Sequence, residues 1–229
     1  MKTSHVLFSV AVIGGTGKEG KALVFRLARA GYKVLIGSRS LKKARSAAAE
    51  FSQNLGGNAV IYGFSNISAT RKADIVILVV PYSAHKDLLE IIKKAMRGKL
   101  LIDATVPLTL SDVSIVQMPP AGSAAQEAHE ILGDDIQVTT AFQNISYASL
   151  MEEGPVDCDV LVTGTSEAAR SETIKLVSTI GFTGWDAGPI ENSAVVEGLT
   201  SLLIGINKKY KSTSAGIRIS GVNRSTVIR

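Results

Sequence analysis

The sequence predicts a protein of the α/β class, built on a doubly wound parallel sheet with helices on both faces. Short runs rich in valine and isoleucine alternate with longer amphipathic stretches, as expected when each strand is followed by a crossover helix. Several runs, such as residues 74–81 after the initial Asp74, are apolar at consecutive positions rather than at every second position. That pattern is typical of strands that are covered on both faces.

The first part of the chain contains six candidate strands with helices between them. The strands are expected over residues 10–15, 33–38, 59–64, 74–81, 99–105 and 136–142, and helices over residues 21–31, 41–56, 83–96 and 123–132. Because strand, helix and strand follow at short spacing, the crossovers are expected to be right-handed.

The second part of the chain predicts a small C-terminal α/β addition. A strand is expected over residues 158–164, a helix over 166–181, a short strand and turn over 182–189 and a strongly apolar helix over 192–210. Such an apolar helix must be buried in its own domain or in a subunit interface. We therefore divide the chain into residues 1–150, 151–210 and a basic tail, 211–229.

The composition excludes several classes of protein. At 45% apolar residues, the 229-residue chain can bury a sizeable core, and its one cysteine, Cys158, allows no intramolecular disulfide. We expect a cytoplasmic protein, with residues 5–15 forming a buried strand rather than a signal peptide. No apolar run approaches the roughly 20 residues that span a bilayer, so no membrane partner is expected.

The positive charge of the chain is confined to its end. The chain carries a net charge of +5, but residues 208–229 hold six cations and no acid, so the rest carries −1. Because the body is not basic, we expect no nucleic-acid partner. We interpret the basic end as a solvated or disordered tail; attraction of an anionic ligand or partner is the alternative.

A glycine-rich loop predicts a dinucleotide site and makes the fold Rossmann-type. Gly15, Thr16, Gly17, Lys18, Glu19 and Gly20 satisfy the pattern G-x-G-x-x-G between a strand and a helix. Gly15 permits the tight turn, Gly17 lets the backbone approach a pyrophosphate, and Gly20 lets the helix lie close to the strand. Free N–H groups at the start of the helix would then face the anion.

The end of the second strand favours NADP over NAD. A site for NAD usually has an acid there, which accepts hydrogen bonds from the ribose, whereas this chain has Ser38, Arg39 and Lys43. Arg39 can pair with a 2′-phosphate, Ser38 can donate a hydrogen bond, and Lys43 lies one helical turn further on.

The strand ends that follow predict a substrate pocket poor in acids and bases. Ligands of such sheets bind at the carboxyl ends of the strands, where Val106, Phe142, Gln143 and Ile145 are expected. We predict no metal site and no catalytic side chain, and we expect His85, at a helix start, to be exposed. Hydride exchange between two ring cofactors needs only stacked rings and the exclusion of water.

Four stretches together resemble a known family. They are "VIGGTGKEGKAL" with "IGSRS", "DIVILVVP", "GSAAQEAHEIL" and "DAGPIENSAVVEGLTSLLI", and the resemblance covers residues 9 to about 219. They are similar to the NADPH-dependent reductases of the 8-hydroxy-5-deazaflavin coenzyme F420. The resemblance implies hydride transfer between NADP(H) and coenzyme F420, and a homodimer formed with the closing apolar helix.

The resemblance also implies which residues contact the cofactor. They are Thr16, Gly17, Lys18, Glu19, Ser38, Arg39, Lys43, Tyr82 and Lys86. The chain departs from the family on the side of the electron acceptor, where residues 142–146 replace a Leu-His-Thr-Ile-Pro-like stretch and residues 82–84 a Trp-Glu-His-like one. Two alternatives therefore stay open: reduction of another acceptor (a flavin, an imine or a keto acid), and NADP sensing without catalysis.

Overall fold

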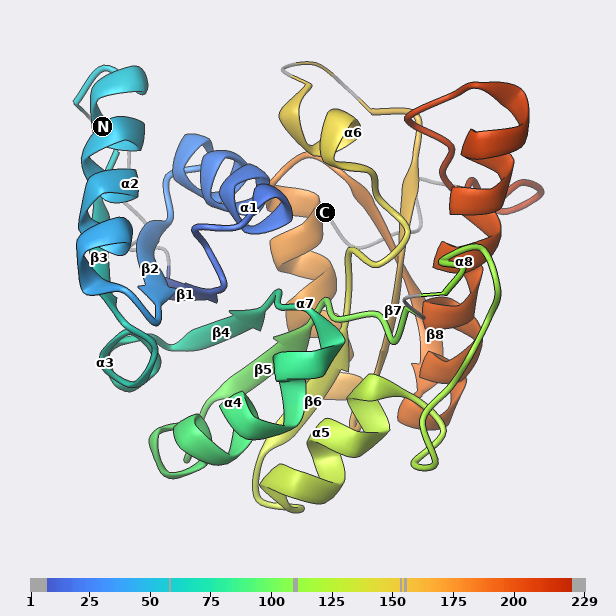
Figure 1. Cartoon of the computed structure of the whole chain (residues 1–229), viewed down its shortest axis with the longest axis horizontal. Helices are drawn as coiled ribbons and strands as arrows, with labels where there is room; N and C mark the ends of the chain where they lie inside the picture. The colour runs from blue at the N-terminus through green and yellow to red at the C-terminus, as the bar shows by residue number, and fades with distance from the viewer. Residues whose placement is uncertain (1–7, 58, 109–110, 153, 155, 224–229) are drawn as a thin grey trace.

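An eight-stranded sheet forms the centre of the molecule, as the computed structural model shows (Figure 1). The structure describes residues 8–57, 59–108, 111–152, 154 and 156–223. The strands are β1 (Ser9–Ile13), β2 (Lys33–Ser38), β3 (Ile61–Ser65), β4 (Ile75–Leu78), β5 (Leu100–Asp103), β6 (Gln137–Thr140), β7 (Asp159–Gly164) and β8 (Thr183–Pro189). Their order in the sheet is β3-β2-β1-β4-β5-β6-β7-β8.

Helices connect the strands in the places that the sequence predicts, with two short ones added. The helices are α1 (Lys18–Arg29), α2 (Leu41–Asn54), α3 (Asn66–Lys72), α4 (His85–Ile92), α5 (Ala124–Leu132), α6 (Tyr147–Met151), α7 (Glu167–Thr179) and α8 (Ser193–Tyr210). Short 3₁₀ turns are η1 (Tyr82–Ala84), η2 (Lys93–Ala95) and η3 (Ile190–Asn192). The two short helices α3 and α6 are not among the predicted elements. None of the helices in the described ranges is both long and apolar enough to cross a membrane.

The predicted doubly wound fold is confirmed. Strands β1 to β6 are parallel, and the chain runs from β1 outward to β3 before it returns to β4 on the other side of β1. This reversal leaves a crevice at the carboxyl ends of β1 and β4, where Rossmann folds bind dinucleotides.

The C-terminal addition extends the same sheet. Strand β7 pairs with β6 in the antiparallel direction, which is the one departure from parallel pairing, and β8 pairs with β7 in parallel. The boundary near residue 150 therefore falls between two strands that are neighbours in one sheet. Division of the chain at this point stays a prediction.

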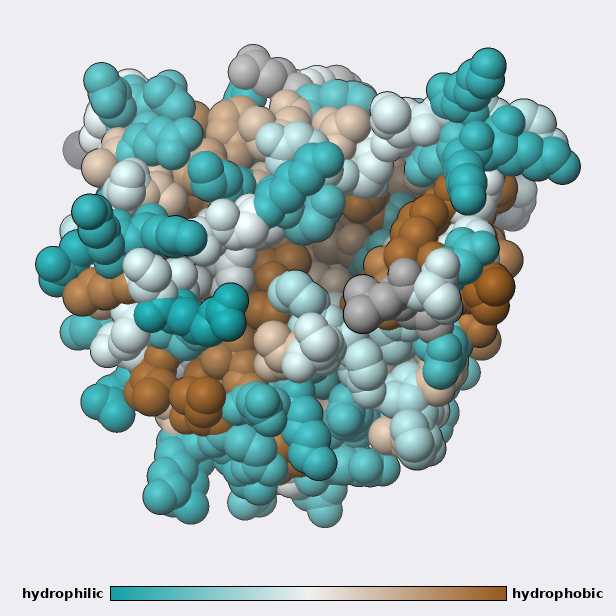
Figure 2. Space-filling model, in the orientation of Figure 1, coloured by the Kyte–Doolittle hydropathy of each residue, from teal (hydrophilic) through white to brown (hydrophobic). Residues whose placement is uncertain are grey.

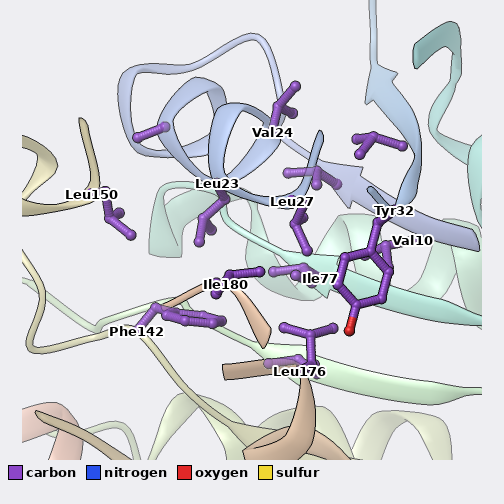
Figure 3. Packing of buried hydrophobic residues seen from close by; sticks show 14 of the residues in the cluster. Val10, Leu23, Val24, Leu27, Tyr32, Ile77, Phe142, Leu150, Leu176 and Ile180 are labelled. Carbon is purple, nitrogen blue, oxygen red and sulfur yellow. The ribbon is translucent and has the colours of Figure 1, made fainter. Parts of the chain in front are cut away.

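Two apolar cores hold the helices against the two faces of the sheet. Helices α1, α2 and α7 contribute to one core, and α3, α4 and α5 to the other. In Figure 3, Leu23 and Leu27 of α1 point toward Ile77 of β4 and Ile180 at the end of α7. Burial of one such leucine stabilises the fold by about 1.5–3 kcal/mol.

The segment after α8 is bound to the body, so the prediction of a solvated tail is wrong for residues 215–219. The backbone N–H of Asp159 donates to Ile217 O at 2.7 Å, and the N–H of Ile219 donates to Asp159 Oδ2 at 2.8 Å. Arg218 pairs with Asp157. The side chains along 215–219 alternate between half-buried and exposed, as in an extended strand that rests on the protein. Residues 224–229 lie outside the described residues.

Candidate active site

The glycine loop has the geometry that the motif predicts. Gly14 takes a left-handed φ of 92°, and the chain turns tightly as the N–H of Gly17 donates to Gly14 O at 2.9 Å. A Cβ on Gly20 would lie 2.3 Å from Gly14 O, so only glycine allows α1 to pass this close to the loop. A Cβ on Gly17 would meet only Gly14 O, at 3.3 Å, and that side of the loop is therefore open to a ligand.

The start of α1 leaves its first backbone N–H groups free for an anion. Helices α2, α3, α5, α6 and α7 each begin at a serine whose hydroxyl accepts a hydrogen bond from the first turn. Helix α1 begins at Gly17 and has no side-chain cap among the described residues. Uncapped N–H groups at the positive end of a helix dipole bind phosphate, so the residues present fit the pyrophosphate of a dinucleotide.

The residues predicted to read the 2′-phosphate lie beside this loop. Ser38 ends β2, and its Oγ lies 3.4 Å from Thr16 Oγ1 of the loop. Arg39 follows it, is exposed and forms no ion pair with another described residue. Lys43 is exposed in the first turn of α2. The structure thus brings one buried hydroxyl and two exposed cations together with no carboxylate at the strand end.

A cleft of about 850 Å³ opens from the glycine loop across the carboxyl ends of the strands. Figure 2 shows the hollow near the centre of this face, with apolar side chains inside it. One wall is formed by α1 and α6, and the floor by the ends of β4, β5 and β6. The opposite wall is formed by α8 and by Thr213 and Ala215 of the final segment. Ligand sites in proteins usually occupy roughly 300–1,000 Å³, so the cleft has the size of a binding site.

The structure brings most of the predicted site residues to this cleft. Those that line it are Gly17, Lys18, Glu19, Gly20, Tyr82, Val106, Phe142, Gln143 and Ile145. The remaining predicted residues of the cofactor site, Gly15, Thr16, Ser38, Arg39 and Lys43, do not line the cleft and lie at or beside the loop. Lys86 is exposed on α4 and does not line the cleft.

The end of β6 is held in an unusual conformation at the floor of the cleft. Phe142 has φ 76°, a left-handed value that costs a non-glycine residue about 1–2 kcal/mol. Hydrogen bonds to α8 hold the segment that follows. Thr200 Oγ1 donates to Gln143 O at 2.9 Å, and Asn144 Nδ2 donates to Val196 O at 3.0 Å. Strained backbone of this kind is common at ligand sites, where surrounding bonds maintain it.

His85 is fully buried, so its predicted exposure is wrong. Its Nε2 lies 2.7 Å from Asp103 Oδ2 at the end of β5, and its Nδ1 lies 3.2 Å from Glu127 Oε2 in the first turn of α5. Burial alone would lower the pKa of His85, but the charges and hydrogen bonds of Asp103 and then Glu127 outweigh it and raise that pKa. The ring is therefore an imidazolium over a wider pH range than usual.

Tyr82 connects this buried cluster with the cleft. Its ring stacks on that of His85 at 5.8 Å between centroids, and the carboxylate of Glu127, which His85 also contacts, acts on its hydroxyl. Burial, then the bond and charge of Glu127, raise the pKa of Tyr82 to about 12. The hydroxyl thus keeps its proton at physiological pH and acts as a hydrogen-bond donor.

A second buried carboxyl group, that of Glu197, joins α8 to α5. Its two oxygens accept hydrogen bonds from the N–H groups of Ala124 at 2.8 Å and Ala125 at 3.1 Å. Burial raises the pKa of Glu197 to about 8, against the lowering effect of these two bonds. Glu197 therefore caps α5 in place of a nearby side chain.

The residues of α8 that form one wall of the cleft were not predicted as site residues from the sequence. Thr200, Leu203, Ile204 and Asn207 of α8 line the cleft, together with Thr213 and Ala215. Their spacing of three and four residues along one helix face is a signal that could have identified them. The same spacing also describes any buried helix face, and this ambiguity is why α8 was interpreted only as a buried or interface helix.

Comparisons with known proteins identify the family of the chain. The family described as NADP oxidoreductase, coenzyme F420-dependent, matches residues 9–107. The chain is 38% identical to an F420-dependent NADP reductase of Methanocaldococcus jannaschii and 40% identical to one of Methanothermobacter marburgensis. Each alignment covers 93% of this chain and 98% of the relative.

Solved structures show the same fold. A proposed F420-dependent NADP reductase from Arthrobacter sp. FB24 superposes with a TM-score of 0.80 at 22% identity and covers 93% of this chain and all of its own. An imine reductase from Myxococcus stipitatus superposes with a TM-score of 0.61 at 20% identity, over 90% of this chain and 62% of its own. The match to the family model and the identity of 38–40% over nearly the full length lead to one conclusion: the chain belongs to the family of coenzyme F420-dependent NADP oxidoreductases.

Proposed function

We propose that this protein transfers hydride between NADP(H) and coenzyme F420, an 8-hydroxy-5-deazaflavin. The observation that carries the proposal is the large, mainly apolar cleft that begins at an uncapped, glycine-rich helix start and continues past the ends of β4, β5 and β6. The relatives that are 38–40% identical over nearly their whole length are reductases of this kind.

The residues of the loop and of β2 would hold NADP. Gly15, Gly17 and Gly20 shape the loop for the pyrophosphate, while Thr16, Lys18 and Glu19 line or flank it. Ser38, Arg39 and Lys43 would bind the 2′-phosphate, and Tyr82 the nicotinamide end, as the resemblance to the family implies. Lys86 is further from the cleft and has the weakest support among these residues.

The deeper part of the cleft would hold the deazaflavin ring. Val106, Phe142, Gln143 and Ile145 supply an apolar floor with one amide. When bound, the nicotinamide supplies the hydride from its C4 atom. The chain contributes binding, orientation and the exclusion of water, which together can lower a barrier by several kcal/mol without a covalent or acid–base step.

The exposed apolar face of α8 supports a homodimer. Val195, Leu202 and Ile206 lie at spacings of seven and four residues along one face and are exposed, as are Ile115 and Val116 of the loop that packs on α8. A second copy of this chain would cover this face. The buried, unpaired thiol of Cys158 fits a reducing cytoplasm, where we place the protein.

The test is to mix the protein with NADPH and oxidised F420 and to follow both absorbances. We expect equal amounts of NADPH oxidised and F420 reduced, and no comparable oxidation of NADH. The same assay with a flavin, a cyclic imine and a keto acid in place of F420 examines the alternative acceptors. NADPH binding without turnover of any acceptor would contradict the proposal and support an NADP-sensing role.

A further inference from the structure

Beneath the cleft lies a cluster of ionisable groups that simple hydride transfer does not require. His85, Asp103 and Glu197 are buried in it, and Tyr82 and Glu127 are half-buried. Four elements contribute to it: Tyr82 from η1, Asp103 from β5, Glu127 from α5 and Glu197 from α8, with His85 in the middle. Burial of charged groups such as His85 and Asp103 is costly unless each is paired. A cluster of this cost directly beneath a ligand site calls for a functional explanation.

The contacts of the cluster reach three parts of the cleft lining. The ring of Tyr82 stacks on that of His85, and Glu127, held by His85, acts on the hydroxyl of Tyr82. Asp103, held by His85, accepts a hydrogen bond from the N–H of Thr105 at 2.9 Å through its other oxygen. This bond shapes the turn that presents Val106.

The third part is the segment after β6. Gln143 Nε2 donates to the backbone carbonyl of Asp103 at 2.7 Å, which fixes the amide of a residue that lines the floor. Tyr82, Val106 and Gln143 come from three different strand ends. His85 contacts both Glu127, which acts on Tyr82, and Asp103, which holds the turn before Val106. Each of its two ring nitrogens forms a hydrogen bond with one of these carboxylates.

We propose that His85 is a positioning residue for hydride transfer, which acts through Glu127 on Tyr82 and through Asp103 on the turn that carries Val106. This role for His85 depends on the proposed function, because hydride transfer is the reaction that it would support. The contacts themselves come from the structure. An imidazolium donates from both nitrogens and so holds both carboxylates at once, whereas a neutral ring donates from only one. Ring-to-ring transfer is sensitive to such support, because a misplacement of about 1 Å can cost 100-fold in rate.

The kinetic test uses His85→Gln, with His129→Gln on α5 as the matched control. We expect kcat to fall about 10- to 100-fold in H85Q, while the KM for NADPH changes less than about threefold because its phosphates bind elsewhere. We expect no change in H129Q. An unchanged kcat in H85Q, or a loss that appears only in KM, would overturn the proposal.

A double-mutant cycle separates positioning from a general loss of structure. If His85 acts largely through Glu127 on Tyr82, the variant H85Q/Y82F should be little slower than the slower of the two single variants. Glu127→Gln should reproduce most of the H85Q effect, with Glu130→Gln, an exposed neighbour on α5, as its control. Effects of H85Q and Y82F that simply multiply would show that the two residues act independently, against the proposal.

A measurement without substrate completes the test and stays informative if the wild type proves inactive toward F420. Imidazole ¹⁵N NMR of the free protein should show His85 protonated on both nitrogens above its ordinary pKa of about 6.5, with a lower midpoint in E127Q. In the active protein, kcat should fall as pH rises through the raised pKa of His85. That decline should persist in E197Q and disappear in H85Q. Titration of His85 at or below its ordinary pKa would overturn the proposal.

Discussion

At the residue scale, cofactor choice depends on the charge at the end of β2. Arg39 is exposed beside the glycine loop and forms no ion pair with another described residue, so it is available to a ligand. We expect Arg39→Ala to weaken NADPH binding by about 1.5–3 kcal/mol, the range of hydrogen bonds to charged groups. NADH has no 2′-phosphate, and its weaker binding should hardly change.

Titration calorimetry with both cofactors measures this difference. Lys42→Ala is the matched control, because Lys42 is an exposed cation in the same region that the motif does not use. Equal losses for NADPH and NADH in R39A would show that Arg39 does not read the 2′-phosphate.

The same scale shows why part of the site was predictable and part was not. The glycine loop is one run of six residues, and Ser38 and Arg39 are adjacent at the end of the next strand, so each part could be identified from a short stretch of sequence. The partners of His85 come from positions 18 and 42 residues further along the chain, on different elements. A histidine at a helix start is usually exposed, and only the sheet order reveals that Asp103 and Glu127 meet it.

Glu197 predicts a pH dependence of stability. Its pKa is raised to about 8 in the folded protein, so the folded state retains a proton that the unfolded state releases near its ordinary pKa. The free energy of unfolding should therefore fall as pH rises from about 5 to 8, by up to about 1.4 kcal/mol per pH unit. His85, whose pKa is also raised, adds a loss of the same sign above its ordinary pKa.

Urea unfolding across this pH range tests the assignment. Glu197→Gln should flatten the slope, since glutamine does not titrate, and leave the smaller contribution of His85. Glu191→Gln, an exposed glutamate just before α8, should keep the slope of the wild type. An E197Q slope equal to that of the wild type would contradict a protonated Glu197.

At the scale of the element, two glycines at the start of α1 have different roles. Gly20 allows the helix to pack against the loop, and Gly17 leaves the loop open to the cofactor. A Cβ on Gly20 would lie 2.3 Å from Gly14 O, so Gly20→Ala must push α1 away from β1. We expect a loss of about 1–3 kcal/mol in the free energy of unfolding, as for other overpacked sites. A Cβ on Gly17 meets only Gly14 O, at 3.3 Å, and faces the cleft.

Gly17→Ala should therefore change stability by less than about 0.5 kcal/mol but weaken NADPH binding at least about tenfold, because its methyl group blocks the approach of the pyrophosphate. Denaturant unfolding and calorimetry on both variants make the comparison. A G17A protein that binds NADPH normally would place the pyrophosphate elsewhere.

The elements also show where patterns in the sequence were ambiguous. Continuous apolar runs predicted the strands, because a parallel strand that is covered on both faces needs apolar side chains along its whole length. Residues 212–223 contain no long apolar run and were interpreted as solvated. Only alternate side chains there, such as Ile217 and Ile219, face the body of the protein. The segment is held by hydrogen bonds between its backbone and Asp159, and backbone hydrogen bonds cannot be predicted from amino-acid composition.

At the scale of the whole molecule, one sheet joins the cofactor loop to α8. The apolar character of α8 predicted a buried or interface helix, and the structure shows one buried side and one exposed apolar side. One face lines the cleft through Thr200, Leu203 and Ile204, and Glu197 reaches α5. The other face leaves Val195 67% and Leu202 52% exposed. The sequence could not assign the two faces, because both are apolar.

The exposed apolar face of α8 predicts that one charged substitution on this face dissociates the proposed dimer. Leu202→Glu places a carboxylate at the centre of the face formed by Val195, Ile206 and the loop residues Ile115 and Val116. Burial of this unpaired charge against its own copy in a second chain would be strongly unfavourable. We expect sedimentation equilibrium to show a dimer for the wild type and a monomer for L202E. The circular dichroism spectrum should not change, because Leu202 is exposed in the single chain.

Ile91→Glu, at a similarly exposed isoleucine on α4, should remain dimeric. A monomeric wild type, or a dimeric L202E, would contradict the assignment of this face to a second copy.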